Sequence, residues 1–379
     1  MITVKKDEIA LLRKDSVQTL IASLACILGG LLVGYIALLI IEPGGALKAI
    51  TDLMKSFLRF PGALKMKYFG QTLVRTVPLL MCALSVLFAY RVGMFNIGVA
   101  GQYVAGACAC LYAALGWNLP WWACLILAMA AGAALGTVAG MLKTLRHVNV
   151  VITGIMLNWI VLYLTNLVLT GVKSFNSPYT KPLRGNNPAA LIPGLGLEKL
   201  FHNEKSVTVA IPLAVIMAIV VWVVLHKTRF GYELKATGNN HHAAKYAGMK
   251  ENRNIILTML IAGALAGMGA GLLYLTGIEE WETTASSLPG MGFNGIAAAF
   301  LGGLSPLGSI LSAFLIQYIT TGGGYVDLQV YSAQISGLIT SLIIYLCAFA
   351  AFFKFLIRNQ ICRHDEKKAA AMKKGGDGK

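Results

Sequence analysis

The sequence is poor in charge, and this scarcity excludes an ordinary soluble protein. Only 13% of its 379 residues are Asp, Glu, Lys or Arg, about half of the roughly 25% usual in a soluble domain. Apolar residues make up 57% of the chain and the mean hydropathy is +0.69. Several uncharged runs reach the length of about 18 residues that a helix needs to cross a bilayer. The composition therefore predicts an all-α, polytopic membrane protein.

Motifs for catalysis, cofactors and metals are also missing. No GxxxxGK[ST] string occurs, so the chain has no P-loop for ATP phosphates. No acidic residue lies in the middle of an apolar run, where ion-coupled carriers usually keep carboxylates. His241 and His242 are adjacent and would point to different faces of a helix, which makes a poor metal site. We expect no catalytic residue, metal or cofactor on this chain.

The seven cysteines and the N-terminus give no sign of secretion. Six cysteines lie inside apolar runs and Cys362 lies in the tail, without a CxxC pair, so we expect buried free thiols and no disulfide. The apolar run after Met1–Ser16 is too long for a signal peptide. We interpret it as a retained first span.

Ten expected spans divide the chain into a cytoplasmic N-terminus (1–16), a transmembrane domain (17–353) and a basic cytoplasmic tail (354–379). External loops are expected at 42–70, where an amphipathic helix lies on the outer surface, and at 171–206. The expected spans are approximately 17–41, 71–90, 92–115, 122–142, 148–170, 207–225, 255–277, 289–305, 307–321 and 331–353.

The loop charges predict the orientation. Most of the net charge of +16 falls on the side that holds both termini and the connection 226–254. By the positive-inside rule, that side is the cytoplasm. We therefore expect a multi-pass protein of the cell membrane with both termini cytoplasmic.

A faint internal repeat accompanies these spans. GMFNIG (Gly93–Gly98) follows the second span and GMGFNGI (Gly290–Ile296) follows the seventh. With ten spans, the two halves (spans 2–5 and 7–10) would have opposite orientation. Inverted repeats with glycine-interrupted helices are typical of transport folds, although a match this short also arises by chance.

Polar residues at membrane depth mark a candidate substrate path. In GMFNIGVAGQ, glycines weaken the helix while Asn96 and Gln102 bring amides to a depth where lipid offers no partner. They either line a translocation path or form hydrogen bonds between helices. The candidate path residues are Phe95, Asn96, Gln102, Asn158, Phe293 and Asn294. For Asn166 and Gln317 the structural interpretation is favoured.

Two further features have structural interpretations. Glycines recur every four residues at Gly132–Gly140 and at Gly263–Gly271, so each series gives a smooth face for close helix packing. Arg75 lies inside an expected span; it either snorkels outward or pairs with an acidic residue such as Glu42, and a substrate role stays open.

The connection 226–254 is basic and polar, between two apolar runs. We expect two short helices, at Tyr232–Ala236 and Asn240–Gly248, hinged at Gly238, with Asn239 or Asn240 as the N-cap of the second. Such a pair is suited to dock on a cytosolic partner. The alternative is a solvated loop whose charges only fix topology.

The sequence resembles the ABC importer permeases of the simple-sugar, nucleoside and branched-chain amino-acid group from about Gln71 to Leu346, most closely the nucleoside-type branch. The strings that carry the resemblance are TLVRTVPLLMCALSVLFAYRVGMFNIGVAGQ, TRFGYELKATGNNHHAAKYAGM and GFNGIAAAFLGGLSPLGSILSAFL. The second string resembles the family's segment for coupling to the ATPase. The coupling residues that this resemblance implies are Gly231, Glu233, Ala236, Gly238, Asn239, Ala243, Ala244 and Gly248. One departure is Ala100, where the nucleoside branch often has an acidic residue.

The resemblance implies a permease without enzyme chemistry of its own, which imports a small polar solute, a nucleoside or a simple sugar. It further implies cytosolic ABC ATPase subunits that hold ATP and Mg, a second related or identical permease, and an extracytoplasmic substrate-binding lipoprotein. The alternatives are a branched-chain amino-acid ABC permease and an ion-coupled secondary transporter. The net charge of +16 is explained by loops on one side of the membrane, so we expect no nucleic-acid partner.

Overall fold

The computed structural model describes residues 15–325 and 334–347, together with isolated positions between 349 and 359. The expected N-terminal segment 1–16 and tail 354–379 therefore lie very largely outside the described residues, as does the start of the expected tenth span. Within the described ranges the chain is helical, and the extended pairings are two isolated bridges, Lys173 with Thr180 and Tyr179 with Glu282. The all-α expectation is confirmed for this part of the chain.

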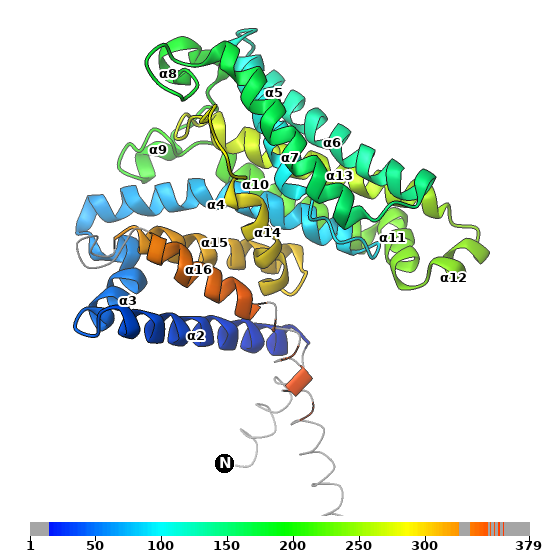
Figure 1. The fold of residues 1–379 in the computed structure, drawn as a ribbon, viewed down its shortest axis with the longest axis horizontal. Helices are drawn as coiled ribbons and strands as arrows, with labels where there is room; N and C mark the ends of the chain where they lie inside the picture. Colours follow the sequence, from blue (N-terminus) through cyan, green and yellow to red (C-terminus); the bar gives the residue numbers. More distant parts are fainter. Residues whose placement is uncertain are drawn as a thin grey trace, which may run out of the picture.

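The elements follow one another in a simple order (Figure 1). They are α2 (Asp15–Ile41), α3 (Ala46–Lys55), η1 (Ser56–Arg59), α4 (Gly62–Tyr90), α5 (Val99–Leu115), α6 (Trp121–Arg146), α7 (Val150–Leu169), η2 (Thr170–Val172), α8 (Leu183–Asn186), η3 (Pro188–Ala190), α9 (Leu197–Leu200), α10 (Ala210–Lys227), α11 (Arg229–Asn239), α12 (His241–Tyr246), α13 (Glu251–Tyr274), α14 (Gly290–Leu301), α15 (Pro306–Gly323) and α16 (Gln334–Cys347).

Six of these helices, α2, α4, α6, α7, α10 and α13, are long and apolar enough to cross a membrane, while α5 and α14 are shorter apolar helices. The six helices identify a multi-pass membrane protein and leave the expected number of ten spans as a prediction. The expected third span differs most from the structure. Residues 94–96 lie outside any helix and α5 begins only at Val99, because the glycine-rich stretch does not continue α4.

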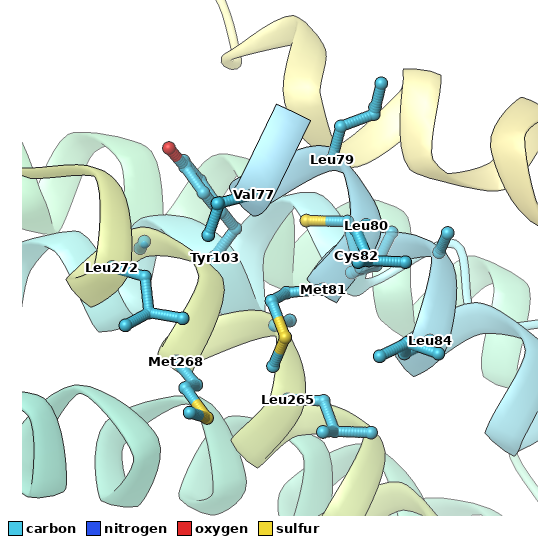
Figure 2. Close-up of a cluster of buried hydrophobic side chains, with 14 of the residues drawn as sticks. Val77, Leu79, Leu80, Met81, Cys82, Leu84, Tyr103, Leu265, Met268 and Leu272 are labelled. Carbon is cyan, nitrogen blue, oxygen red and sulfur yellow. The ribbon is translucent and has the colours of Figure 1, made fainter. Parts of the chain in front are cut away.

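Two helices form the centre of the bundle. The apolar windows of α4 and α13 are 89% and 72% buried, against 28–39% for the other four long helices. Figure 2 shows Met81 of α4 beside Leu265 and Met268 of α13, and all three side chains are buried. The outer helices instead expose large apolar side chains, such as Leu28 on α2 and Leu167 on α7. This pattern is expected of helices that face lipid on one side.

Small residues determine how α13 packs against α6. A Cβ on Gly132 would overlap the carbonyl oxygen of Gly263, and a Cβ on Gly267 would overlap that of Ala128. Lipid is as apolar as the side chains, so close van der Waals contact between backbones is what holds such helices together. The structure thus confirms the packing role predicted for the two glycine series.

The long loop between α7 and α10 closes one end of the bundle. It lies at the left of Figure 1 with α3, opposite α11 and α12. The side chain of Asn166 accepts a hydrogen bond from Trp281 Nε1 at 2.9 Å and donates to the carbonyl of Ala285 at 2.8 Å. Arg75 lies 3.8 Å from Glu279 in the loop after α13. The structural interpretation of Asn166 and the acidic loop partner of Arg75 are therefore confirmed.

Candidate functional site

Three of the expected path residues form one buried amide cluster, which we define as Asn96, Gln102 and Asn158. Their side chains are 1–2% exposed. Asn96 Nδ2 donates to Gln102 Oε1 at 2.9 Å, Gln102 Nε2 donates back to Asn96 Oδ1 at 3.2 Å, and Asn96 also donates to the Ser85 hydroxyl at 3.3 Å. The two amides therefore satisfy each other across the non-helical stretch.

Asn158 of α7 holds the same stretch from the other side. Its Oδ1 accepts a hydrogen bond from the backbone N–H of Gly101 at 2.7 Å, and its Nδ2 donates to the carbonyl of Ile97 at 3.1 Å. One side chain thus satisfies a free donor in the first turn of α5 and a carbonyl of the preceding loop. Such groups would be costly if left unpaired at membrane depth.

The other expected path residues lie around α14. Phe95 is half-buried, and its ring centroid lies 6.3 Å from that of Phe300. Phe293 is 41% exposed and Asn294 is half-buried, both in the first turns of α14. The structure thus joins the amide cluster into one unit and places the second motif on a neighbouring helix. A lining role for these six residues stays a prediction.

The departure at Ala100 has a structural reason. A Cβ on Gly292 of α14 would lie 2.5 Å from the Cα of Ala100, which is itself buried. The first turn of α14 therefore packs directly on the first turn of α5. An acidic side chain at this position would collide with α14, so Ala100 allows this close contact between α5 and α14.

The basic connection folds into two helices whose boundaries differ from the prediction. α11 continues through Gly238 to Asn239, so the expected hinge at Gly238 is wrong and the break falls at Asn240. The hydroxyl of Thr228 caps α11 by accepting from the N–H of Gly231. Asn240 Oδ1 caps α12 by accepting from the N–H of Ala243 at 3.0 Å, as one of the two predicted caps.

Much of α11 contacts the membrane helices. A Cβ on Gly231 would overlap the carbonyl oxygen of Val224 in α10, and a Cβ on Gly238 would overlap the carbonyl oxygen of Arg91. Thr237 is buried and accepts a hydrogen bond from Asn254 of α13 at 3.2 Å. These contacts fix α11 to α10, to the turn after α4, and to α13.

The remaining expected coupling residues lie on the second half of α11, on α12 and in the turn after α12. Ala236 is half-buried, Asn239 and Ala243 are exposed, and Ala244 faces inward with 4% of its surface exposed. Gly248 adopts a φ of +81°, which favours glycine, in the turn after α12.

A cavity of about 480 Å³ separates α11 from the start of α13. Its charged lining residues are Arg229, Glu233, Lys250 and Arg253. Three cations face one carboxylate, so the lining of the cavity has a net charge of +2.

Arg91, Thr237 and Asn254 were not among the sequence-predicted site residues. Arg91 directly follows the expected span 71–90 and belongs to no expected motif position. Thr237 lies inside the coupling string but is not one of the coupling residues that the resemblance implies. A polar pair separated by 17 residues carries no periodic signal. Only the packing of α11 against α13 brings Thr237 and Asn254 together.

Long apolar helices that pack through glycine, joined by a basic helix pair, define a multi-pass membrane protein. Residues 68–348 match the family described as "Branched-chain amino acid transport system / permease component". Because the match covers well over half of the chain, the protein belongs to this family.

Three curated relatives resemble the chain over most of its length. The guanosine ABC transporter permease protein NupP of Bacillus subtilis (strain 168) is 35% identical over 67% of this chain and 73% of its own. The nucleoside ABC transporter permease protein NupB of Lactococcus lactis subsp. cremoris (strain MG1363) is 32% identical over 81% and 85%. The glucose ABC transporter permease protein TsgB13 of Haloferax volcanii is 31% identical over 76% and 78%. No solved structure matches the chain.

Proposed function

We propose that this protein is the membrane-spanning permease subunit of an ABC importer that moves a nucleoside into the cytoplasm. The similarity to the guanosine and nucleoside permeases, at 35% and 32% identity over most of both chains, carries this proposal. The glucose permease of Haloferax volcanii supports a simple sugar as the second candidate substrate. The substrate then moves through the protein without being chemically changed.

We propose ten spans arranged as two inverted halves, α4–α7 and α13–α16. The helix contacts support this division: α13 packs against α5 and α6, and α4 packs correspondingly against α14 and α15, while α4 and α13 contact each other. Such a pattern is expected of a pseudo-twofold axis between α4 and α13. The positive-inside rule supports cytoplasmic termini and places α11 and α12 in the cytoplasm.

Cytosolic ATPase subunits, which hold ATP and Mg, are proposed to dock on α11 and α12. The cavity of net charge +2 supports a partner surface with acidic side chains. A second permease, identical or related, and an extracytoplasmic substrate-binding lipoprotein complete the proposed assembly. ATP binding would draw the ATPases together, displace α11 and change the access of the solute path.

The amide cluster is proposed to line the solute path when the bundle opens. Replacing Asn96 by Leu leaves the Gln102 amide and the Ser85 hydroxyl without this partner, at a cost of about 1–3 kcal/mol. We expect Asn96→Leu to lower solute uptake while the ATPase still co-purifies. Wild-type affinity and rate of uptake in Asn96→Leu would assign the cluster a purely structural role.

The proposed function is tested on the chain purified with a co-expressed candidate ATPase, the candidate second permease and the binding protein. Nucleosides, pentoses, hexoses and branched-chain amino acids are each assayed for stimulation of ATP hydrolysis. Stimulation by nucleosides alone is expected, whereas stimulation by hexoses or branched-chain amino acids would reassign the substrate. Failure to associate with any ATPase, together with vanadate-insensitive uptake driven by an ion gradient, would establish a secondary transporter instead.

A further inference from the structure

Arg91, at the end of α4, lies between α11 and the turn that joins α14 to α15. Its carbonyl oxygen occupies the position that a Cβ on Gly238 of α11 would take. Its side chain extends in the other direction, where Nη2 donates to the carbonyl oxygen of Leu304 at 2.7 Å. One residue therefore contacts the expected coupling segment through its backbone and the turn after α14 through its guanidinium group.

The turn that Arg91 holds has an unfavourable backbone conformation. Leu304 has a φ of +53° and follows Gly303 at +65°, and a left-handed conformation is uncommon for a bulky side chain. Two hydrogen bonds hold Leu304 in place: its N–H donates to the carbonyl of Ala299 at 2.8 Å and its carbonyl accepts from Arg91. Strained backbone of this kind persists where the surroundings determine it.

No ion pair fixes Arg91 to α11 within the described part of the chain. Arg91 Nε has no hydrogen-bond partner there, and the nearby charged group on α11 is Lys235, whose pKa is lowered by partial burial and by the charge of Arg91. These like charges repel each other. The connection between α11 and Arg91 is therefore steric, through the close contact at Gly238.

From the Leu304 turn, α14 extends to the candidate substrate path. The ring of Phe300 lies 5.6 Å from that of Tyr90 at the end of α4 and 6.3 Å from that of Phe95. At the other end of α14, Gly292 contacts Ala100 in the first turn of α5. Movement of α14 would thus alter the non-helical stretch on which the amide cluster is built.

We propose that Arg91 is a positioning residue that transmits displacement of α11 to α14, and through α14 to the candidate substrate path. When α11 moves, the close contact at Gly238 displaces the backbone of Arg91. The hydrogen bond from the Arg91 guanidinium then displaces the Leu304 turn. This inference rests on the proposed function, because it takes displacement of α11 by an ATPase as its starting point.

The test measures movement of α14 directly and needs no knowledge of the substrate. Phe293 is 41% exposed at the start of α14, so Phe293→Cys provides a site for maleimide labelling. The full chain is purified with its ATPase and labelled in the nucleotide-free state and after trapping with ATP and vanadate. The parent chain, labelled in parallel, serves as the blank for the native cysteines.

We expect the labelling rate of Phe293→Cys to differ severalfold between the two states, and to become equal in the two states when Arg91→Met is added. Arg91→Lys, which retains a donor, should restore part of the difference. Arg146→Met, an exposed arginine at the end of α6, is the matched control and should leave the difference unchanged. Co-purification of the ATPase is measured for every variant.

Two labelling results would overturn the proposal. The first is that Phe293→Cys with Arg91→Met keeps the difference in labelling rate between the two states. The second is that Phe293→Cys with Arg91 intact binds the ATPase but labels at the same rate in both states. Loss of ATPase co-purification in Arg91→Met would also overturn it, because Arg91 would then act in docking. If the Phe293→Cys protein with Arg91 intact binds no ATPase, the proposed function itself fails. That result is distinct from the three outcomes that overturn the role of Arg91.

Discussion

The two helices of the basic connection differ in what they contact, although they are adjacent in sequence and both polar. α11 has three buried residues, Gly231, Leu234 and Thr237, and meets the backbone of the turn after α4. In α12, Ala244 is the buried residue among those whose side chains the structure describes. The comparison shows that α11 is packed on the membrane helices, while most of α12 is exposed; the proposed docking surface is therefore expected mainly on α12.

The largest effect is expected from Gly238→Asp on α11. The new side chain would overlap the carbonyl oxygen of Arg91, which is backbone and cannot rotate away. Overpacking of this kind costs about 1–3 kcal/mol or more, and we expect uptake to be lost because α11 separates from the turn. Gly185→Asp makes the same substitution at an exposed glycine of α8, where a Cβ has nothing within 4 Å, and should retain uptake. Normal uptake by Gly238→Asp would remove the distinction between the helices.

Ala243→Trp tests the outward surface of α12. Ala243 is exposed, so the fold should accept tryptophan, and the melting temperature in detergent should stay near that of the parent. A bulky ring on the docking face should nevertheless abolish ATPase co-purification and uptake. Ala244→Trp, at a buried position, should instead lower the melting temperature. Equal behaviour of the two variants would contradict an outward-facing docking surface.

Arg253→Glu reverses one charge at the cavity beside α11. Because charge complementarity sets association rates and partner choice, we expect a several-fold loss of ATPase affinity that shrinks as salt is added. Arg146→Glu makes the same change at the end of α6 and should have little effect. Chemical modification of Arg253 in the presence of the ATPase or of vesicles with anionic lipid gives the contrary outcome. If the vesicles protect Arg253 and the ATPase does not, the cavity is a lipid headgroup site.

The smallest effect is expected from Thr237→Val, which removes the hydrogen bond between α11 and Asn254. A buried amide left unpaired costs about 1–3 kcal/mol, so the melting temperature should fall by a few degrees while most uptake remains. Thr137→Val is the control, because the Thr137 hydroxyl donates only to the carbonyl of Ala133 in its own helix. A parental melting temperature for Thr237→Val would mean that the glycine contacts and the buried Leu234 hold α11 without this hydrogen bond.

Local pattern predicted much of this fold. Long uncharged runs predicted the apolar helices, the four-residue glycine spacing predicted close helix packing at each series, and Asn240 was one of the two predicted caps. That the two glycine faces pack on each other, α6 on α13, is seen only in the structure. The end of α11 was predicted wrongly because Gly238 was interpreted as a break. The structure shows that this glycine is instead required for close contact with Arg91 inside a continuous helix.

The sequence alone determined the class of protein, since burial of apolar length in a membrane depends only on composition and run length. It also located the polar residues of both candidate regions, because polar groups at membrane depth stand out against an apolar background. The tertiary structure decided which polar groups pair with each other. It also decided which glycines pack against another helix of this chain rather than face the proposed ATPase. Arg91 and Leu304 are 213 residues apart, and only the packing of α14 beside α4 brings that donor to that carbonyl.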